Sequence, residues 1–277
     1  MKNTNQTIII GKQILSKNEI DEREARLLLA YVMGINHQEL IKYTEIEDEI
    51  YAKFLVVLEK RCQGIPYAYI VGHKEFMKLD FIVNSNVLIP REDTEILVQK
   101  IIDISKTINK EKIKILDLCT GSGCIAISLA KYIENAQVTG ADISSEALNI
   151  AKENAKINDV KVTFVKSDIF GSIDGKFDII VSNPPYIKTK VINDLQKEVK
   201  ENEPFIALDG GEDGRSFYKN IIDNAKKYLV DDGVIAFEIG YDQRVEVEKL
   251  LAEGMYKNIE SFKDYSGNDR VVIAYGG

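Results

Sequence analysis

Hydrophobic positions along this chain follow two different periods, and the change of period divides the sequence. Over about the first 75 residues, apolar side chains recur every three or four positions, which is typical of amphipathic helices. Helices are predicted over residues 18–33, 36–43 and 47–63. Gly34 follows the first of these, and Gly64 and Pro66 follow the last, where helices commonly end. We therefore expect residues 1–75 to form a small helical domain.

The period becomes two near residue 76. Residues 76–83 and 87–90 alternate like strands, with the polar turn Asn84–Asn86 between them. This pattern predicts a β-hairpin over residues 76–90 that links the bundle to a second domain over residues 91–277.

Strand and helix patterns alternate through that second domain. Strands are predicted over residues 114–118, 137–141, 161–166, 177–182, 234–238, 259–265 and 270–275, and helices over 94–104, 124–133, 145–158, 214–229 and 242–253. Short loops between such elements predict a parallel sheet covered by helices on both faces. The last two strands are joined only by residues 266–269, which is too short for a crossover helix, so they must form an antiparallel hairpin. The expected class is α/β, with a Rossmann-like, mostly parallel seven-stranded sheet.

Composition and charge exclude several classes of protein. The chain has 277 residues, of which 45% are hydrophobic and 29% charged, as in ordinary globular proteins. No apolar run approaches the ~20 residues of a membrane helix, and the first ten residues are too polar for a signal peptide, so we expect a cytoplasmic protein without membrane contact. The net charge of −8 argues against direct nucleic-acid binding. Three cysteines and two isolated histidines predict neither a disulfide framework nor a metal site.

A glycine-rich turn between the first strand and helix of the second domain is the first candidate site. It comprises Cys119, Thr120, Gly121, Ser122 and Gly123. Glycines let the backbone approach a ligand, and a helix N-terminus offers free N–H groups. Asp142, at the end of the next strand, could accept both hydroxyl groups of a ribose. A tight turn without any ligand is the alternative reading.

The glycine turn alone does not distinguish a dinucleotide from S-adenosylmethionine, because its spacing fits both. Asp117, just before the turn, favours S-adenosylmethionine, since a carboxylate suits an α-ammonium group and would repel a pyrophosphate. At the end of the third strand, Asp168 could accept a hydrogen bond from an adenine amino group and Ile169 could cover the ring. A solvated aspartate at a strand end is the alternative for Asp168.

The sequence Asn183-Pro184-Pro185-Tyr186 is the most informative stretch, since it ends a buried apolar strand. The residue before a proline is held extended, and proline has no N–H, so the turn is a rigid rim with free acceptors. The side-chain oxygen of Asn183 and the carbonyl of Pro184 could both accept from one planar –NH2 group, with Tyr186 packed on that group. Gripping both hydrogens stabilises the positive charge that develops on the nitrogen during methyl transfer. A proline-stiffened structural turn is the alternative.

These motifs resemble the amino-methylating branch of the class I S-adenosylmethionine-dependent methyltransferases. Further stretches resemble the HemK-type protein-(glutamine-N5) methyltransferases of peptide chain release factors: residues 64–72, 87–95, 203–204, 207–214, 237–240 and 269–272. The resemblance covers residues 16–275. It implies a helical N-terminal bundle, a hairpin linker and a seven-stranded domain, with the glutamine of a Gly-Gly-Gln loop as substrate and S-adenosylhomocysteine as product.

The resemblance also implies site residues. The cofactor would contact residues 119–123, Asp142, Asp168, Ile169 and Asn183, and the substrate glutamine would meet Asn183, Pro184, Pro185 and Tyr186. Cys119 departs from the family's pattern, which commonly has glycine there, and Ile169 stands where an aromatic residue can occur. We expect a monomer. An adenine-N6 or other nucleic-acid amino methyltransferase, and a non-catalytic nucleotide-binding module, are the alternatives.

Overall fold

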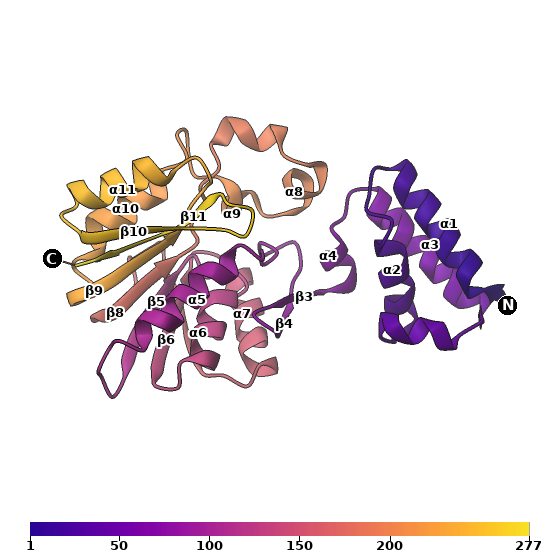
Figure 1. The fold of residues 1–277 in the computed structure, drawn as a ribbon, viewed down its shortest axis with the longest axis horizontal. Helices are drawn as coiled ribbons and strands as arrows, with labels where there is room; N and C mark the ends of the chain where they lie inside the picture. The colour runs from indigo at the N-terminus through magenta and orange to yellow at the C-terminus, as the bar shows by residue number, and fades with distance from the viewer. Residues whose placement is uncertain (277) are drawn as a thin grey trace. The chain divides into compact units, whose positions relative to one another are not determined.

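The protein is described here from a computed structural model, which describes residues 1–276. The chain divides into two compact units (Figure 1). One comprises residues 1–72 together with 196–202, and the other comprises residues 73–195 together with 203–277. Within the described residues, no helix is long and apolar enough to cross a membrane.

The N-terminal unit is a helical bundle. Its helices are α1 (Thr4–Lys17), α2 (Glu24–Met33), the 3-10 helix η1 (His37–Lys42), α3 (Asp48–Cys62), α4 (Tyr67–Val71) and α8 (Lys197–Asn202), and its two short strands are β1 (Lys2–Asn3) and β2 (Glu45–Ile46). The core is formed by apolar residues of α1, α2 and α3, with Leu15, Leu28 and Phe54 fully buried. Gly11 permits close contact between helices, since a Cβ there would lie 2.6 Å from the Phe54 ring.

Helix α8 completes this bundle although it lies far along the chain. Arg61 of α3 is buried and forms ion pairs with Glu24 at 2.6 Å and with Glu198 at 2.8 Å. The Asn202 side chain donates to the carbonyl of Gly64 at 3.0 Å. The second predicted domain, over residues 91–277, is therefore interrupted by seven residues that belong to the N-terminal unit.

The second unit is built on a seven-stranded sheet, as predicted. Its strands are β5 (Ile113–Leu118), β6 (Ala136–Asp142), β7 (Val162–Lys166), β8 (Phe177–Ser182), β9 (Leu229–Glu238), β10 (Lys257–Lys263) and β11 (Asp269–Tyr275), in the order β10-β11-β9-β8-β5-β6-β7. All neighbouring pairs are parallel except those of β11, which is antiparallel to both β9 and β10. The predicted parallel sheet with a C-terminal antiparallel hairpin is confirmed.

Helices cover both faces of this sheet (Figure 1). They are α5 (Thr94–Ser105), α6 (Cys124–Tyr132) and α7 (Ser145–Ile157) on one face and α10 (Ser216–Ala225) and α11 (Arg244–Glu253) on the other, with η2 (Thr189–Asp194) and α9 (Phe205–Leu208) in the connection between β8 and α10. Because side chains alternate along a strand, Ile115 and Ile179 pack under α5 and α6, whereas Leu116 and Ile180 pack under α10 and α11. Both sheet faces are apolar, as buried parallel strands require.

The predicted hairpin over residues 76–90 is wrong in register. The observed strands are β3 (His73–Phe76) and β4 (Leu79–Ile82), joined by Met77 and Lys78, and residues 87–90 form no strand. Both turn residues have positive φ, 50° and 58°, as in the turns that match strand twist. Asn or Gly usually signals such a turn, so a Met-Lys pair gave no sequence signal, while the polar residues 84–86 did.

Other elements also differ from prediction, and two near the N-terminus have a local reason. Helix α1 was not predicted, because its three consecutive isoleucines and Gly11 obscure the helical period. The predicted helix over 18–33 begins only at Glu24, since Glu19 has a positive φ of 59° and ends the preceding turn.

Candidate active site

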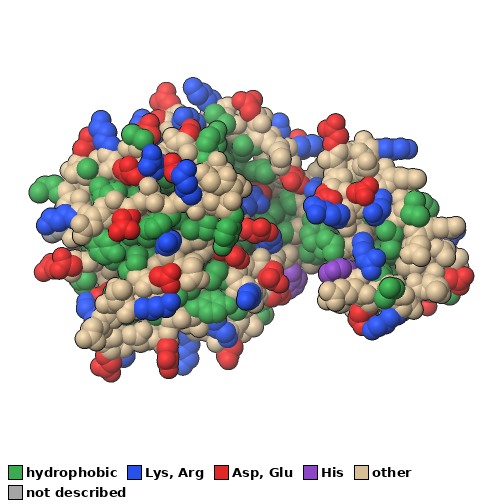
Figure 2. All heavy atoms as spheres, in the orientation of Figure 1, with side chains coloured by type: hydrophobic (Ala, Val, Ile, Leu, Met, Phe, Trp, Pro, Cys, Tyr) green, Lys and Arg blue, Asp and Glu red, His purple; other side chains and the backbone are tan. Residues whose placement is uncertain are grey.

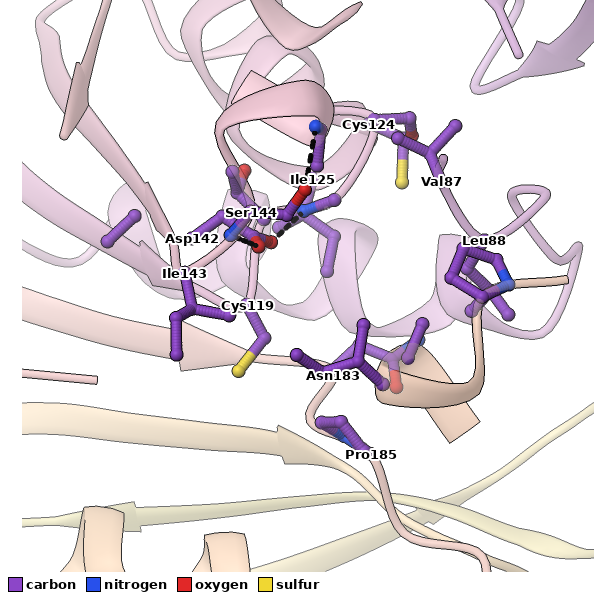
Figure 3. A pocket seen from close by; sticks show the side chains of 18 of the residues that line it. Val87, Leu88, Cys119, Cys124, Ile125, Asp142, Ile143, Ser144, Asn183 and Pro185 are labelled. Carbon is purple, nitrogen blue, oxygen red and sulfur yellow. Dashed lines mark hydrogen bonds between the residues drawn. The ribbon is translucent and has the colours of Figure 1, made fainter. Parts of the chain in front are cut away.

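A pocket opens at the carboxyl edge of the sheet, where β5 and β8 lie side by side. From these neighbours the chain continues in opposite directions across the sheet, and ligands of open α/β sheets bind at such switch points. The Ser182 hydroxyl donates to the Leu118 carbonyl at 2.7 Å, so the ends of both strands are tied together. The glycine turn follows Leu118 and the Asn-Pro-Pro-Tyr turn follows Ser182. The pocket holds about 1050 Å³, its open mouth included (Figure 3).

The glycine turn forms one wall of this pocket. Gly121 has φ of +53°, and a Cβ added to it would meet nothing within 4 Å, so the backbone is open to a ligand there. Gly123 has φ of +80°, and its Cβ would lie 2.9 Å from Ile127, so glycine is needed for packing beneath α6. Cys119 also has a positive φ, 59°, a strained conformation for a residue with a side chain. This conformation explains why glycine would be favoured at that position.

Asp142 lies at the end of β6, beside this turn. Its Oδ2 accepts from the backbone N–H of Gly121 at 2.8 Å and its Oδ1 accepts from that of Ser144 at 2.9 Å. Burial raises the pKa of this carboxyl, although the backbone N–H groups act in the opposite direction. A carboxylate offers about four lone-pair positions, so these two bonds leave each oxygen able to accept another hydrogen. Asp142 is thereby held rigidly at the pocket wall with acceptor capacity to spare (Figure 3).

Asp117 is placed differently from the other predicted residues, because it is fully buried and does not line the pocket. Its Oδ2 accepts from the Thr120 hydroxyl at 2.5 Å and from the Ala126 N–H at 3.2 Å. Its Oδ1 has no hydrogen-bond partner among the described residues. Burial raises the pKa of this carboxyl to about 7. The structure therefore does not bring the predicted cofactor-binding Asp117 to the pocket wall; it bonds instead to the glycine turn and to the start of α6.

The corner after β7 contributes to the lining of the same pocket. Asp168 and Ile169 both line the pocket, and Asp168 is exposed. Ile169 has φ of 48°, which is an outlier for a β-branched residue. Such strain is retained where surrounding contacts fix the backbone, which is common at functional sites.

The Asn-Pro-Pro-Tyr turn is only partly within the pocket. Asn183 and Pro185 line it, whereas Pro184 and Tyr186 do not (Figure 3). The Tyr186 hydroxyl donates to Oε1 of Glu238 at 3.2 Å, and burial beside that carboxylate raises the pKa of the tyrosine. Asn183 therefore lines the same pocket as the glycine turn. The Tyr186 hydroxyl instead bonds to Glu238, which does not line the pocket.

The pocket also contains residues that motif reasoning did not assign to the site. They are Asn86, Val87, Leu88, Pro90, Arg91, Thr94, Cys124, Ile125, Ala141, Ile143, Ser144, Ala147, Ser167, Pro204, Ile206, Ala207 and Phe217. Arg91 forms an ion pair with the buried Glu203, which joins the segment before α5 to the segment before α9. The only sequence signal for these two segments is that both belong to stretches that resemble one family.

The thiols and histidines add no further chemistry to this site. Burial raises the pKa of Cys124 to about 12 and that of Cys119 still higher, so both thiols stay protonated and are poor nucleophiles. Among residues 1–276, no group of three or more His, Cys, Asp or Glu side chains could hold a metal ion.

Comparison with known proteins assigns the chain to a family. Residues 6–72 match the PrmC N-terminal domain and residues 92–201 match the methyltransferase small domain. The release factor glutamine methyltransferase of Thermodesulfovibrio yellowstonii is 40% identical over 267 residues, covering 95% of each chain. That of Agrobacterium fabrum is 40% identical over 255 residues, covering 90% of this chain and 88% of its own. The chain belongs to the release factor glutamine methyltransferase family.

A solved structure agrees with this assignment at the level of the fold. A methyltransferase from Pyrococcus furiosus aligns with a TM-score of 0.56 at 20% identity, over 79% of this chain and 99% of its own. The resemblance read from the motifs is therefore confirmed at family level. The first matched domain, over residues 6–72, lies within the N-terminal unit, and the second, over residues 92–201, lies within the other unit except for residues 196–201.

Proposed function

We propose that the protein methylates the side-chain amide nitrogen of the glutamine in the Gly-Gly-Gln loop of peptide chain release factors, using S-adenosylmethionine. One observation carries this proposal. A single pocket is lined both by the glycine turn with Asp142 and by Asn183 of the Asn-Pro-Pro-Tyr turn. A cofactor wall and an amide-accepting rim therefore meet in one cavity.

The residues of the pocket fit S-adenosylmethionine. Gly121 leaves room for close approach, and Asp142 retains acceptor capacity for ribose hydroxyls. Asp117, predicted to meet the α-ammonium group, is fully buried and does not line the pocket, so it would act by holding Thr120 of the glycine turn in place. Asp168 and Ile169 would hold the adenine. When bound, the cofactor supplies an electrophilic methyl group.

The chain's contribution to the chemistry is to position the amide and to stabilise charge. An amide nitrogen is a weak nucleophile because its lone pair is delocalised. Asn183 Oδ1 and the Pro184 carbonyl would accept its two hydrogens, favouring a pyramidal nitrogen that carries developing positive charge. We assign catalytic roles to Asn183 and Pro184. Tyr186 supports the turn through Glu238, and Pro185 lines the substrate side of the pocket.

The same proposal includes the partners. The protein substrate would be met in the cytoplasm by a monomeric enzyme that needs no direct contact with nucleic acid. Figure 2 supports the last point, because Lys/Arg and Asp/Glu side chains are interspersed over the visible face of each unit rather than gathered by sign. The net charge of −8 agrees with this distribution.

The direct test is to incubate the purified protein with labelled cofactor and a purified release factor, followed by mass spectrometry of the Gly-Gly-Gln peptide. We expect one methyl group on the glutamine side chain. The matched controls are a release factor whose glutamine is replaced by alanine, and the Asn183→Ala enzyme, which should be ~100–1000-fold slower in kcat. DNA and RNA are included as competing acceptors. Label on nucleic acid, or methylation elsewhere in the release factor, would contradict the proposal.

A further inference from the structure

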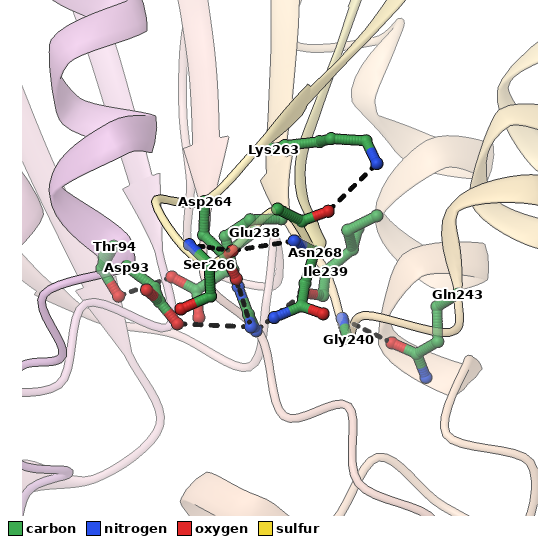
Figure 4. Close-up of polar contacts among 12 residues, drawn as sticks. Asp93, Thr94, Glu238, Ile239, Gly240, Gln243, Lys263, Asp264, Ser266 and Asn268 are labelled. Carbon is green, nitrogen blue, oxygen red and sulfur yellow. Dashed lines mark hydrogen bonds and ion pairs between the residues drawn. The ribbon is translucent and has the colours of Figure 1, made fainter.

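A buried carboxylate lies behind the Asn-Pro-Pro-Tyr turn and has no place in the mechanism above. Glu238, the last residue of β9, is only 2% exposed. Its Oε2 accepts from the Thr94 hydroxyl at 2.5 Å and its Oε1 accepts from the Tyr186 hydroxyl at 3.2 Å (Figure 4 shows the Thr94 contact). Burying a charge is costly unless it serves several partners. Here one carboxylate bonds both to the turn itself and to the helix that begins beside it.

Thr94 connects this carboxylate to the pocket. It is the first residue of α5, it is 2% exposed, and it lines the pocket. Its hydroxyl oxygen lies 3.4 Å from Nδ2 of Asn183. The Thr94 hydroxyl therefore contacts both Glu238 and the side-chain amide of Asn183, which is proposed to bind the substrate.

The direction of each hydrogen bond follows from the chemistry of these groups. An ionised carboxylate can only accept, and a threonine hydroxyl has a single hydrogen. Since that hydrogen is donated to Glu238, the Thr94 oxygen can only accept from Asn183. The oxygen and the –NH2 group of an asparagine amide are almost identical in shape, so only their hydrogen-bond roles, acceptor and donor, distinguish them. The amide must present its –NH2 group to Thr94, which leaves Oδ1 for the pocket.

The charge state of Glu238 depends on several neighbours. Burial raises the pKa of this carboxyl, and Asp93 acts in the same direction, whereas Thr94, Tyr186 and Arg270 favour the ionised form. Arg270 also pairs with Asp264 at 3.0 Å and with Asp93 at 3.2 Å, so its charge is shared among several carboxylates.

We propose that Glu238 and Thr94 are positioning residues that hold Asn183 with its Oδ1, and not its –NH2 group, facing the substrate amide. This inference rests on the proposed function, because it requires Asn183 to accept a hydrogen bond from the substrate. A flipped Asn183 would turn its –NH2 group toward the –NH2 group of the substrate amide. Two donors cannot bond to each other, so the positive charge on the substrate nitrogen would not be stabilised. Glu238 thus acts on the reaction through two hydrogen bonds without touching the substrate.

Three variants test whether Glu238 and Thr94 position Asn183. Thr94→Val keeps the shape and removes the hydroxyl, Thr94→Ser keeps the hydroxyl, and Glu238→Gln replaces an obligate acceptor with a group that can also donate. We expect Thr94→Val and Glu238→Gln to lower kcat by about 10–100-fold, by analogy with groups that orient a ligand from behind. The KM values for cofactor and release factor should stay within about twofold, and Thr94→Ser should retain most of the activity.

The matched control is Ser105→Ala, which removes another buried hydroxyl from the same helix, where it donates only to a backbone carbonyl within α5. Ser105→Ala should leave kcat unchanged. The proposal is overturned if Thr94→Val keeps wild-type kcat, or if Ser105→Ala loses as much kcat as Thr94→Val. If the wild-type enzyme does not methylate release factor, the proposed function is rejected. If Asn183→Ala is slow but Thr94→Val is fully active, only the positioning role of Thr94 and Glu238 is rejected.

Discussion

At the scale of single residues, two carboxylates beside the glycine turn lie in contrasting environments, and only Asp142 lines the pocket. Asp142 is fixed by two backbone N–H groups and still has acceptor positions free, whereas Asp117 is fully buried with one oxygen unpaired. The same functional group can therefore serve two purposes. Asp142 offers acceptor oxygens at the pocket wall, whereas Asp117 bonds to Thr120 of the glycine turn from within the protein core.

Replacing Asp142 with alanine should weaken S-adenosylmethionine binding. Ribose hydroxyls would lose a charged acceptor, at a cost of ~1.5–3 kcal/mol, so the Kd should rise about 10–100-fold. Isothermal calorimetry measures this directly. The control is Asp231→Ala, which removes an exposed carboxylate from the opposite end of the sheet and should leave the Kd unchanged. Equal Kd values for Asp142→Ala and the wild type would refute the assignment.

Asp117 should make the cofactor-free protein less stable as the pH rises. Its pKa is raised from 3.8 to about 7 in the folded state, so the folded protein holds a proton that the unfolded chain has released. The stabilisation from the neutral carboxyl is complete below about pH 4 and is lost as the pH rises through about 7, at roughly 1 kcal/mol per pH unit. Urea denaturation between pH 5 and 7.5 measures this slope. The isosteric Asp117→Asn variant should have a smaller slope, and an unchanged slope would show that another group is responsible.

At the scale of elements, one side chain joins three of them. Asn154 of α7 is fully buried; its Oδ1 accepts from the Ile82 N–H at 2.7 Å, and its Nδ2 donates to the carbonyls of Ile82 and Ser122. Strand β4, helix α7 and the glycine turn are thereby held in register. Among the described residues, no other side chain bonds to both the β3–β4 hairpin and the glycine turn.

Asn154→Ala should therefore affect both stability and ligand binding. Three buried backbone groups would lose their partner, so we expect a loss of ~2–4 kcal/mol in the free energy of unfolding, together with weaker cofactor binding. Chemical denaturation and calorimetry report the two effects. Asn224→Ala, which removes an amide that bonds only to the nearby Asn220 and Lys227 at the end of α10, is the control and should change neither. Full stability of Asn154→Ala would show that water replaces the amide.

The elements differ in how well the sequence predicts them. Buried strands such as Phe177–Ser182 were predicted residue for residue, because their apolar runs end at clear turn signals. Asn183 was placed at the site for the same reason, since it follows such a strand. The partners of Asn154 lie 72 and 32 residues away and those of Thr94 lie 144 and 89 residues away, and no local pattern records contacts of that range. The Met77-Lys78 turn was missed because its residues are atypical for positive φ.

At the scale of the whole molecule, the N-terminal unit is expected to recognise the release factor. Deleting residues 1–72 should leave cofactor binding largely intact, because every residue lining the pocket belongs to the other unit. Methylation of whole release factor should fall by about tenfold or more, the equivalent of ~1.4 kcal/mol of recognition energy, whereas a short Gly-Gly-Gln peptide should lose little. Methylation assays with both substrates distinguish the two roles. Equal losses for protein and peptide would assign the helices to stability instead.

A point variant supplies the control for this deletion. Glu198→Ala removes one ion pair of Arg61 and retains the whole N-terminal unit, so it loosens the attachment of α8 alone. It should keep most of the activity on whole release factor. If it loses as much as the deletion does, the effect of the deletion comes from residues 196–202 and not from recognition by residues 1–72.

The membership of α8 in the first unit sets an order of events during synthesis. Glu198 leaves the ribosome 137 residues after Arg61, which at ~5–20 residues per second is a delay of about 7–27 seconds. Throughout that interval a buried arginine has only Glu24 as its ion-pair partner among the described residues, and the helical bundle lacks α8. Strands β5 to β8 are made in the meantime. The first unit to be started is thus completed only when most of the parallel sheet already exists, so a chain arrested before residue 196 would expose an unfinished bundle to chaperones and proteases.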